Sequence, residues 1–213
     1  VIPLAKPSIG EEEIRLVTEV LQSGVLSLGS KQAEFEKRFA ALVGTTYATG
    51  VNSGTSGLHL IVRALGIGKG DEVITTPFSF VASANCILYE HAKPVFVDVE
   101  EDTFNIDPVK IEAAITPRTK AILLAHIFGQ SCDMTKIMKI AERYKLKVIE
   151  DACESISATH YGKNVGTFGD VAVFAFYPNK QMTTGEGGMI VTNNEKIHEY
   201  CKSTANQGRS DNM

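Results

Sequence analysis

Short apolar segments alternate along this chain with segments that repeat apolar residues at helical spacing. Helix-like segments lie at 58–65, 82–89, 108–115 and 134–144. The strand-like segments occupy 47–51, 72–76, 94–98, 121–126, 147–151, 171–177 and 188–192. Strands that alternate with helices in this way favour a sheet covered by helices on both faces. We therefore expect an α/β fold with a mostly parallel, seven-stranded sheet flanked by helices.

Two further helices are expected before the first strand. Ser8 and Glu11 fit a capping box, and apolar residues recur at helical spacing over 14–21 until Gly24. A second helix is expected over 32–42. With no linker or repeat in the sequence, we expect residues 1–213 to form one large domain that includes this N-terminal helical arm.

Composition and charge exclude several classes of protein. The 213 residues are 44% hydrophobic and 22% charged, which is typical of a globular domain with a substantial core. A net charge of -4 without a basic run gives little support to nucleic-acid or anionic-membrane binding. No apolar segment approaches the roughly 20 residues of a membrane span, and no secretory signal is expected.

Cysteine and histidine spacing gives no metal site. Cys86, Cys132, Cys153 and Cys201 are scattered and form no C-x-x-C pair. This pattern favours reduced thiols and a cytoplasmic location over a disulfide or zinc framework. The five histidines also lack the spacing of metal ligands.

Three candidate segments directly follow predicted strands, where ligands bind in sheets of this kind. They are 52–57, Asp151 and Lys180. Lys180 comes after a continuously apolar strand and before a glycine-rich turn at 185–188. A lysine in apolar surroundings is poorly solvated, which favours a neutral amine able to attack a carbonyl or act as a base. The alternative for any lysine is a solvated surface position.

The other two candidates suit an anion and a protonated ring. The loop at 53–56 offers backbone N–H groups and hydroxyls for a phosphate, although such a turn is more often a simple helix cap. Asp151 could keep a protonated ring nitrogen charged, as pyridoxal phosphate requires, or form an internal salt bridge or cap. Phe78 and Phe80 could stack on a planar ring or pack in the core. The carboxylates at 100–102 look like a solvated turn.

Taken together, these motifs resemble the DegT/DnrJ/StrS family of pyridoxal-phosphate-dependent sugar aminotransferases, in the fold-type-I class. The resemblance covers essentially the whole chain. The matching segments are 52–56, 77–82, 94–98, His126-Ile-Phe-Gly-Gln130, Glu150-Asp-Ala-Cys-Glu154 and 176–188.

The resemblance implies a role for six residues. Lys180 would be the catalytic lysine that forms the Schiff base, and Asp151 would be the partner of the pyridine nitrogen. Phe80 would stack on the ring, and Glu154 would lie near the ring hydroxyl. Thr55 and Ser56 would bind the phosphate. One position departs from the family. Ala175 stands five residues before the lysine, where relatives often have a serine that contacts phosphate.

The resemblance also implies an activity and partners. The enzyme would move an amino group from glutamate, or another amino acid, to a nucleotide-linked keto sugar, as a homodimer. Lysine at position 180, where the related dehydratases have histidine, favours transfer over deoxygenation. Relatives continue into a smaller C-terminal domain that we expect to be absent here, so we expect the 213-residue chain to lack activity alone. The alternatives are a non-catalytic regulatory or binding protein with this fold, and a sugar dehydratase.

Overall fold

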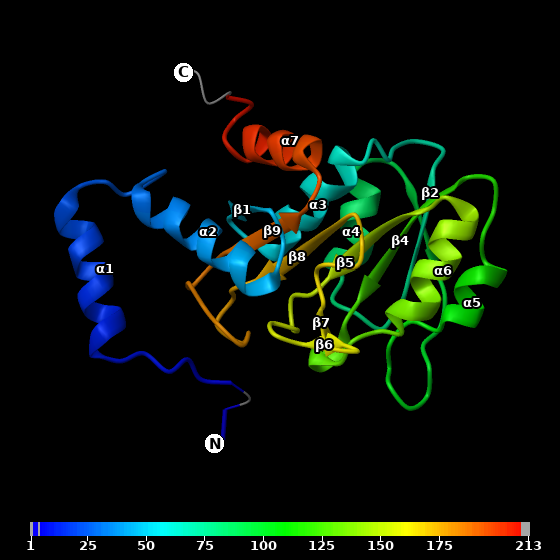
Figure 1. The fold of residues 1–213 in the computed structure, drawn as a ribbon, viewed down its shortest axis with the longest axis horizontal. Helices are drawn as coiled ribbons and strands as arrows, with labels where there is room; N and C mark the ends of the chain where they lie inside the picture. Colours follow the sequence, from blue (N-terminus) through cyan, green and yellow to red (C-terminus); the bar gives the residue numbers. More distant parts are fainter. Residues whose placement is uncertain (1, 4, 210–213) are drawn as a thin grey trace.

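A seven-stranded sheet forms the centre of the protein, for which a computed structural model describes residues 2–3 and 5–209 (Figure 1). Its strand order is β1-β9-β8-β5-β4-β2-β3. The strands are β1 (Tyr47–Val51), β2 (Glu72–Thr75), β3 (Lys93–Phe96), β4 (Thr119–Ala125), β5 (Lys147–Asp151), β8 (Val171–Ala175) and β9 (Gly188–Thr192). The predicted α/β class and seven-stranded sheet are confirmed.

Six of the seven strands run in the same direction, and β9 is the exception. Strands β3, β2, β4, β5 and β8 pair in parallel, whereas β9 runs antiparallel to both β8 and β1. In the β1–β9 pair, Val51 lies opposite Gly188. The end of the first strand and the start of the last strand therefore meet at the same edge of the sheet.

Helices cover both faces of the sheet. On one face lie α3 (Gly54–Ala64), α4 (Ala82–Tyr89) and α7 (Glu195–Ala205); on the other lie α2 (Ser30–Val43), α5 (Pro108–Ala113) and α6 (Met134–Tyr144). The side chains of β8, which point alternately to the two faces of the sheet, show why a layer of helices is needed on each face. Val171 and Val173 pack under α3, whereas Ala172 and Phe174 pack under α2. A strand that is apolar on both sides requires two covers.

The structure corrects the predicted start of the first helix. Helix α1 (Glu11–Ser23) begins after Gly10, and the Glu13 side chain accepts the Gly10 N–H at 2.7 Å. The capping box predicted for Ser8 and Glu11 is wrong, because Glu11 is the first helical residue instead of the third. None of the α1 residues is buried, and Figure 1 shows the helix apart from the sheet.

Some elements carry no clear sequence signal and were not predicted. They are α7, the short hairpin of β6 (Thr159–His160) and β7 (Lys163–Asn164), and a 3-10 turn at Ile127–Gly129.

Within residues 2–3 and 5–209, no helix is long and apolar enough to cross a membrane. The same residues contain no group of three or more metal-ligating side chains placed to hold an ion.

Candidate active site

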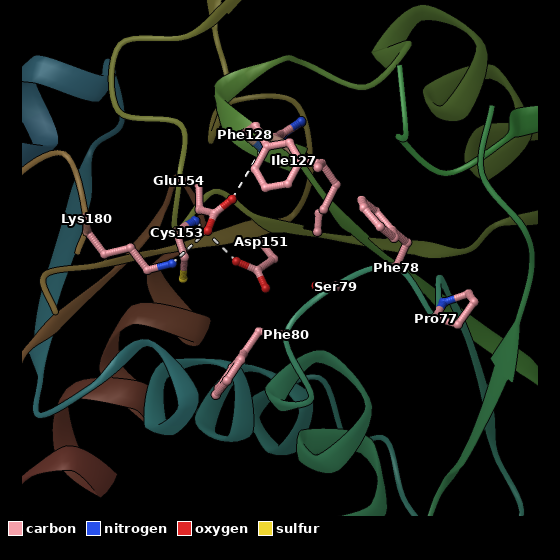
Figure 2. Close-up of a pocket in the computed structure, with 12 residues that line it drawn as sticks. Pro77, Phe78, Ser79, Phe80, Ile127, Phe128, Asp151, Cys153, Glu154 and Lys180 are labelled. Carbon is pink, nitrogen blue, oxygen red and sulfur yellow. Dashed lines mark hydrogen bonds and ion pairs between the residues drawn. The ribbon is translucent and has the colours of Figure 1, made fainter. Parts of the chain in front are cut away.

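A pocket of about 280 Å³ opens at the carboxyl edge of the parallel strands (Figure 2). Four segments line it, and each directly follows a strand: 77–80 after β2, 125–128 at the end of β4, 151–154 at the end of β5, and Lys180 after β8. Parallel strands bring their carboxyl ends to one edge, so residues far apart in the sequence converge there. Among the six predicted site residues, Phe80, Asp151, Glu154 and Lys180 lie together in this pocket.

Lys180 enters the pocket from a loop that is closed at its base. The Phe176 N–H donates to the carbonyl of Gly187 at 2.9 Å, and the Thr184 N–H donates to the carbonyl of Phe176 at 3.0 Å. The Lys180 side chain is 17% exposed, and its Nζ lies 2.9 Å from Glu154 Oε1. The lysine is therefore largely withdrawn from solvent, as expected, and is held by a carboxylate.

Glu154 connects the lysine to a second loop. Its Oε1 atom pairs with Lys180, and its Oε2 atom accepts the backbone N–H of Phe128 at 3.2 Å (Figure 2). The sequence indicated Glu154 only through the family resemblance. Its contact with Phe128 was not predicted, because the 3-10 turn that presents this N–H has no sequence signature.

Asp151 presents a buried carboxylate to the pocket. The residue is 8% exposed, the Ser83 hydroxyl donates to Oδ2 at 3.0 Å, and the Cys153 N–H donates to Oδ1 at 3.2 Å. No cationic side chain within the described ranges forms an ion pair with it. A carboxylate buried with only neutral donors favours a cation in the adjacent space.

Ser83 and Cys153 are site residues that the sequence did not reveal. Ser83 is a polar residue on the otherwise largely apolar helix α4, and this contrast was the one available signal. Cys153 lines the pocket, where burial, followed by the charge of Asp151, raises the pKa of its thiol well above the ordinary range. The thiol is therefore protonated and unsuited to nucleophilic attack.

The structure places Thr55 and Ser56 beside this pocket rather than in its lining. Ser53 caps α3 by accepting the Ser56 N–H at 3.1 Å, and the hydroxyl of Ser53 also donates to that of Ser56 at 3.0 Å. Ser56 lines a neighbouring groove with Asn52. The Thr55 hydroxyl has no hydrogen-bond partner among the described residues.

The first turn of α3 nevertheless adjoins the pocket. A Cβ added to Gly54 would lie 2.9 Å from Cys153 Sγ and 2.9 Å from Ala175 Cβ. The free N–H groups that begin a helix thus lie next to the site, where they suit an anion. Ala175 faces this turn with a methyl group and offers no hydroxyl.

Phe80 and Phe78 lie on different parts of the pocket wall. Phe80 is 74% exposed and lies across the pocket from Phe128, with Asp151 between them (Figure 2). Phe78 lies at the end of the pocket opposite Lys180. Phe78 is 43% exposed, so neither Phe78 nor Phe80 is a buried core residue.

A buried hydrogen-bond network around Glu150 supports the strand ends that carry these residues. Glu150, next to Asp151, is fully buried and accepts backbone N–H groups from Gly166, Phe168 and Gly169 at 2.7–2.8 Å. The Nδ1 atom of His126 accepts the Cys132 N–H at 3.1 Å, so the ring proton lies on Nε2, which donates to Glu150 at 3.1 Å. This network fixes the ends of β4 and β5.

Comparison with known proteins identifies close relatives. The chain is 48% identical over 209 residues to the spore coat polysaccharide biosynthesis protein SpsC of Bacillus subtilis, covering 98% of this chain and 54% of SpsC. It is 46% identical over 212 residues to the GDP-perosamine synthase of Caulobacter vibrioides, covering 99% of this chain and 57% of that synthase. The chain thus spans about half the length of the curated relatives it matches.

A solved structure shares the same fold. NtdA from Bacillus subtilis, solved with bound cofactor PMP, superposes with a TM-score of 0.85 at 38% identity, covering 95% of this chain and 48% of NtdA. Residues 7–213 also match the sequence profile of one family along nearly the whole chain. The chain belongs to the DegT/DnrJ/EryC1/StrS aminotransferase family.

Proposed function

We propose that this chain is the cofactor-binding large domain of a pyridoxal-phosphate-dependent sugar aminotransferase. The observation that carries the proposal is the pairing, in one pocket, of a largely buried lysine with a buried aspartate that lacks a cationic partner among the described residues. When bound, pyridoxal phosphate supplies an electron-withdrawing ring that stabilises negative charge on a substrate carbon. The PMP-bound relative and the named sugar enzymes support the same assignment.

Asp151 would hold the ring nitrogen in its protonated form. The Ser83 hydroxyl and the Cys153 N–H each bind a different oxygen of the carboxylate, which fixes its orientation. Both donors are neutral, so the full negative charge remains available to the ring. Phe80 would stack on the ring from the opposite side of the pocket.

Lys180 would supply the reactive amine. Its Nζ would bind the cofactor covalently and, once released by the amino donor, would move a proton to and from the substrate carbon. Glu154, which holds this Nζ at 2.9 Å, keeps the amine aimed into the pocket and would lie near the ring hydroxyl.

The start of α3 would bind the phosphate. Thr55 has a hydroxyl without a partner among the described residues, and Ser56 lies in the same turn. Because Ala175 offers no hydroxyl on the facing strand, we expect backbone N–H groups of this turn to provide a larger share of the phosphate contacts.

The donor, acceptor, assembly and location belong to the same proposal. The amino donor would be glutamate or another amino acid, and the acceptor a nucleotide-linked keto sugar, as the name GDP-perosamine synthase suggests for a relative. The homodimer follows from the family resemblance. The four free cysteines support the proposed cytoplasmic location.

Covalent trapping tests the proposal directly. The full gene product is incubated with pyridoxal phosphate, reduced with borohydride, digested and analysed by mass spectrometry. We expect one modified peptide, carrying the adduct on Lys180, and none in Lys180→Ala. In Asp151→Asn the adduct should still form, whereas turnover with glutamate and a panel of nucleotide-linked keto sugars should fall at least a hundredfold. Trapping on other lysines with Lys180 unmodified would contradict the proposal.

A further inference from the structure

Three phenylalanine rings form an exposed aromatic rim beside the pocket. This rim consists of Phe78, Phe104 and Phe128, which are 43%, 48% and 77% exposed. The rings of Phe78 and Phe104 are 5.4 Å apart and inclined by 32°, while Phe128 stands at 89° to Phe78 with 6.2 Å between centroids. The rings of Phe78 and Phe104 thus form the floor of the rim, and the ring of Phe128 stands nearly perpendicular to that of Phe78. Phe78 and Phe128 also line the pocket.

The backbone holds two of these rings in an unfavourable conformation. Phe104 has a φ of 57° and Phe128 a φ of 52°, both in the left-handed region that bulky residues seldom adopt. Such residues persist only where the surrounding structure fixes them, and they gather at ligand sites. Here the strain orients large apolar rings outward, toward solvent.

Asn105 fixes the two loops that carry these residues. It is 1% exposed, its Oδ1 accepts the Ile127 N–H at 2.9 Å, and its Nδ2 donates to the carbonyls of Gln130 and Ser131 at 3.2 and 3.3 Å. The asparagine next to Phe104 therefore uses both ends of its amide to bind the segment that contains Phe128. The rim is preorganised before any ligand arrives.

We propose that the aromatic rim binds the planar base of a nucleotide-linked acceptor, an inference that rests on the proposed function. The pocket of about 280 Å³ lies at the lower end of the range for small-molecule sites, roughly 300–1,000 Å³, so a cofactor and a whole nucleotide-linked substrate would not fit in it together. Within the rim, Phe78 lies at the end of the pocket opposite Lys180 (Figure 2), and Phe104 packs against Phe78. A substrate that reacts at Lys180 and extends outward along the pocket would meet the rim.

Charge favours the base over the diphosphate at this position. The turn that leads into Phe104 carries the carboxylates of Glu100, Glu101 and Asp102, which repel phosphate oxygens. Carboxylates accept hydrogen bonds from the N–H groups on a base edge. Stacking on an aromatic ring suits any base, because every base has a π-face.

The test measures nucleotide binding to rim variants of the full gene product by titration calorimetry. The ligands are GDP, UDP, dTDP and CDP, with inorganic pyrophosphate as the ligand without a base. We expect at least one nucleoside diphosphate to bind, and Phe104→Ala and Phe128→Ala each to weaken it about tenfold. Phe128→Tyr keeps a ring and should retain binding. Tyr161→Ala is the matched control, since Tyr161 is also an exposed aromatic residue at positive φ, 48°, but lies in the β6–β7 turn.

Each result separates this inference from the proposed function. Unchanged affinity in both alanine variants, an equal loss of pyrophosphate binding, or no binding of any nucleoside diphosphate to the parent protein would overturn the rim assignment. A Lys180 adduct formed in the same preparation would show that the proposed chemistry stands without it. Circular dichroism of each variant confirms that the fold is retained.

Discussion

Replacing Glu150 by glutamine should destabilise the protein by an amount that its contacts define. Oε1 accepts the N–H groups of Phe168 and Gly169, and Oε2 accepts those of Gly166 and the His126 ring. A glutamine must put its NH₂ where one of these oxygens lies, whichever way the amide is turned. Two buried donors would then face another donor.

The expected cost follows from those two lost acceptors. A buried polar group without a partner costs about 1–3 kcal/mol, so Glu150→Gln should lower the free energy of unfolding by about 2–6 kcal/mol. Burial alone would raise the pKa of Glu150, but hydrogen bonds from His126 and the backbone outweigh it and hold the pKa below the ordinary value. The substitution therefore also removes a charge that is present at neutral pH.

Urea unfolding followed by circular dichroism measures this loss. Glu36→Gln is the matched control, because among the described residues the Glu36 carboxylate accepts through Oε1 alone, from the Gly50 N–H at 2.8 Å and from an N–H of Gln32 at 3.2 Å. An amide oxygen can replace that single acceptor, so the control should lose less than about 1 kcal/mol. A loss of the same size in both variants would refute the reasoning.

Three further predictions concern pH, packing and thiol reactivity. The hydroxyl of Thr116 and a neighbouring arginine lower the pKa of Glu72 from 4.5 to about 2, so its stabilising contribution is present above pH 4.5 and lost as the pH falls toward 2. Glu72→Gln should therefore flatten the decline of the free energy of unfolding between pH 4.5 and pH 2. The same dependence of this free energy on pH in the variant and the parent protein would contradict the prediction. Gly54→Ala puts a methyl group 2.9 Å from Cys153 Sγ and should cost about 1–3 kcal/mol in thermal unfolding. Gly68→Ala, with its nearest atom at 3.7 Å, is the control, and equal losses in the two would argue against a packing clash. Burial raises the pKa of all four cysteine thiols. Iodoacetamide at pH 8 should therefore modify the cysteines only in urea, which mass spectrometry can measure. Rapid labelling of the folded protein would disprove this prediction.

The sequence could predict the site to the extent that the site depends on strand ends. Asp151 and Lys180 follow continuous apolar runs, and the parallel arrangement places such positions at one edge. Their meeting in one pocket therefore needed no knowledge of individual contacts. Ser83 could not be found in this way, because its role depends on the rotation of α4 against the sheet.

Other features depend on long-range packing that periodicity does not encode. The apolar residues of α1 repeat at helical spacing, yet Ile14, Val17 and Leu21 are 60–62% exposed. The pattern predicted the helix correctly but not what lies against it. The contacts of Asn105 could not be predicted either, because its partners at 127–131 are distant in sequence.

The pairing of β1 with β9 sets an order of events during synthesis. The turn that follows Val51 and the loop that carries Lys180 become neighbours only when residues 188–192 have left the ribosome and paired with residues 47–51. Closing so long a stretch of chain is entropically costly and slow compared with local helix formation. The two halves of the proposed cofactor site therefore come together late in folding, after most of the parallel sheet is already available as a template.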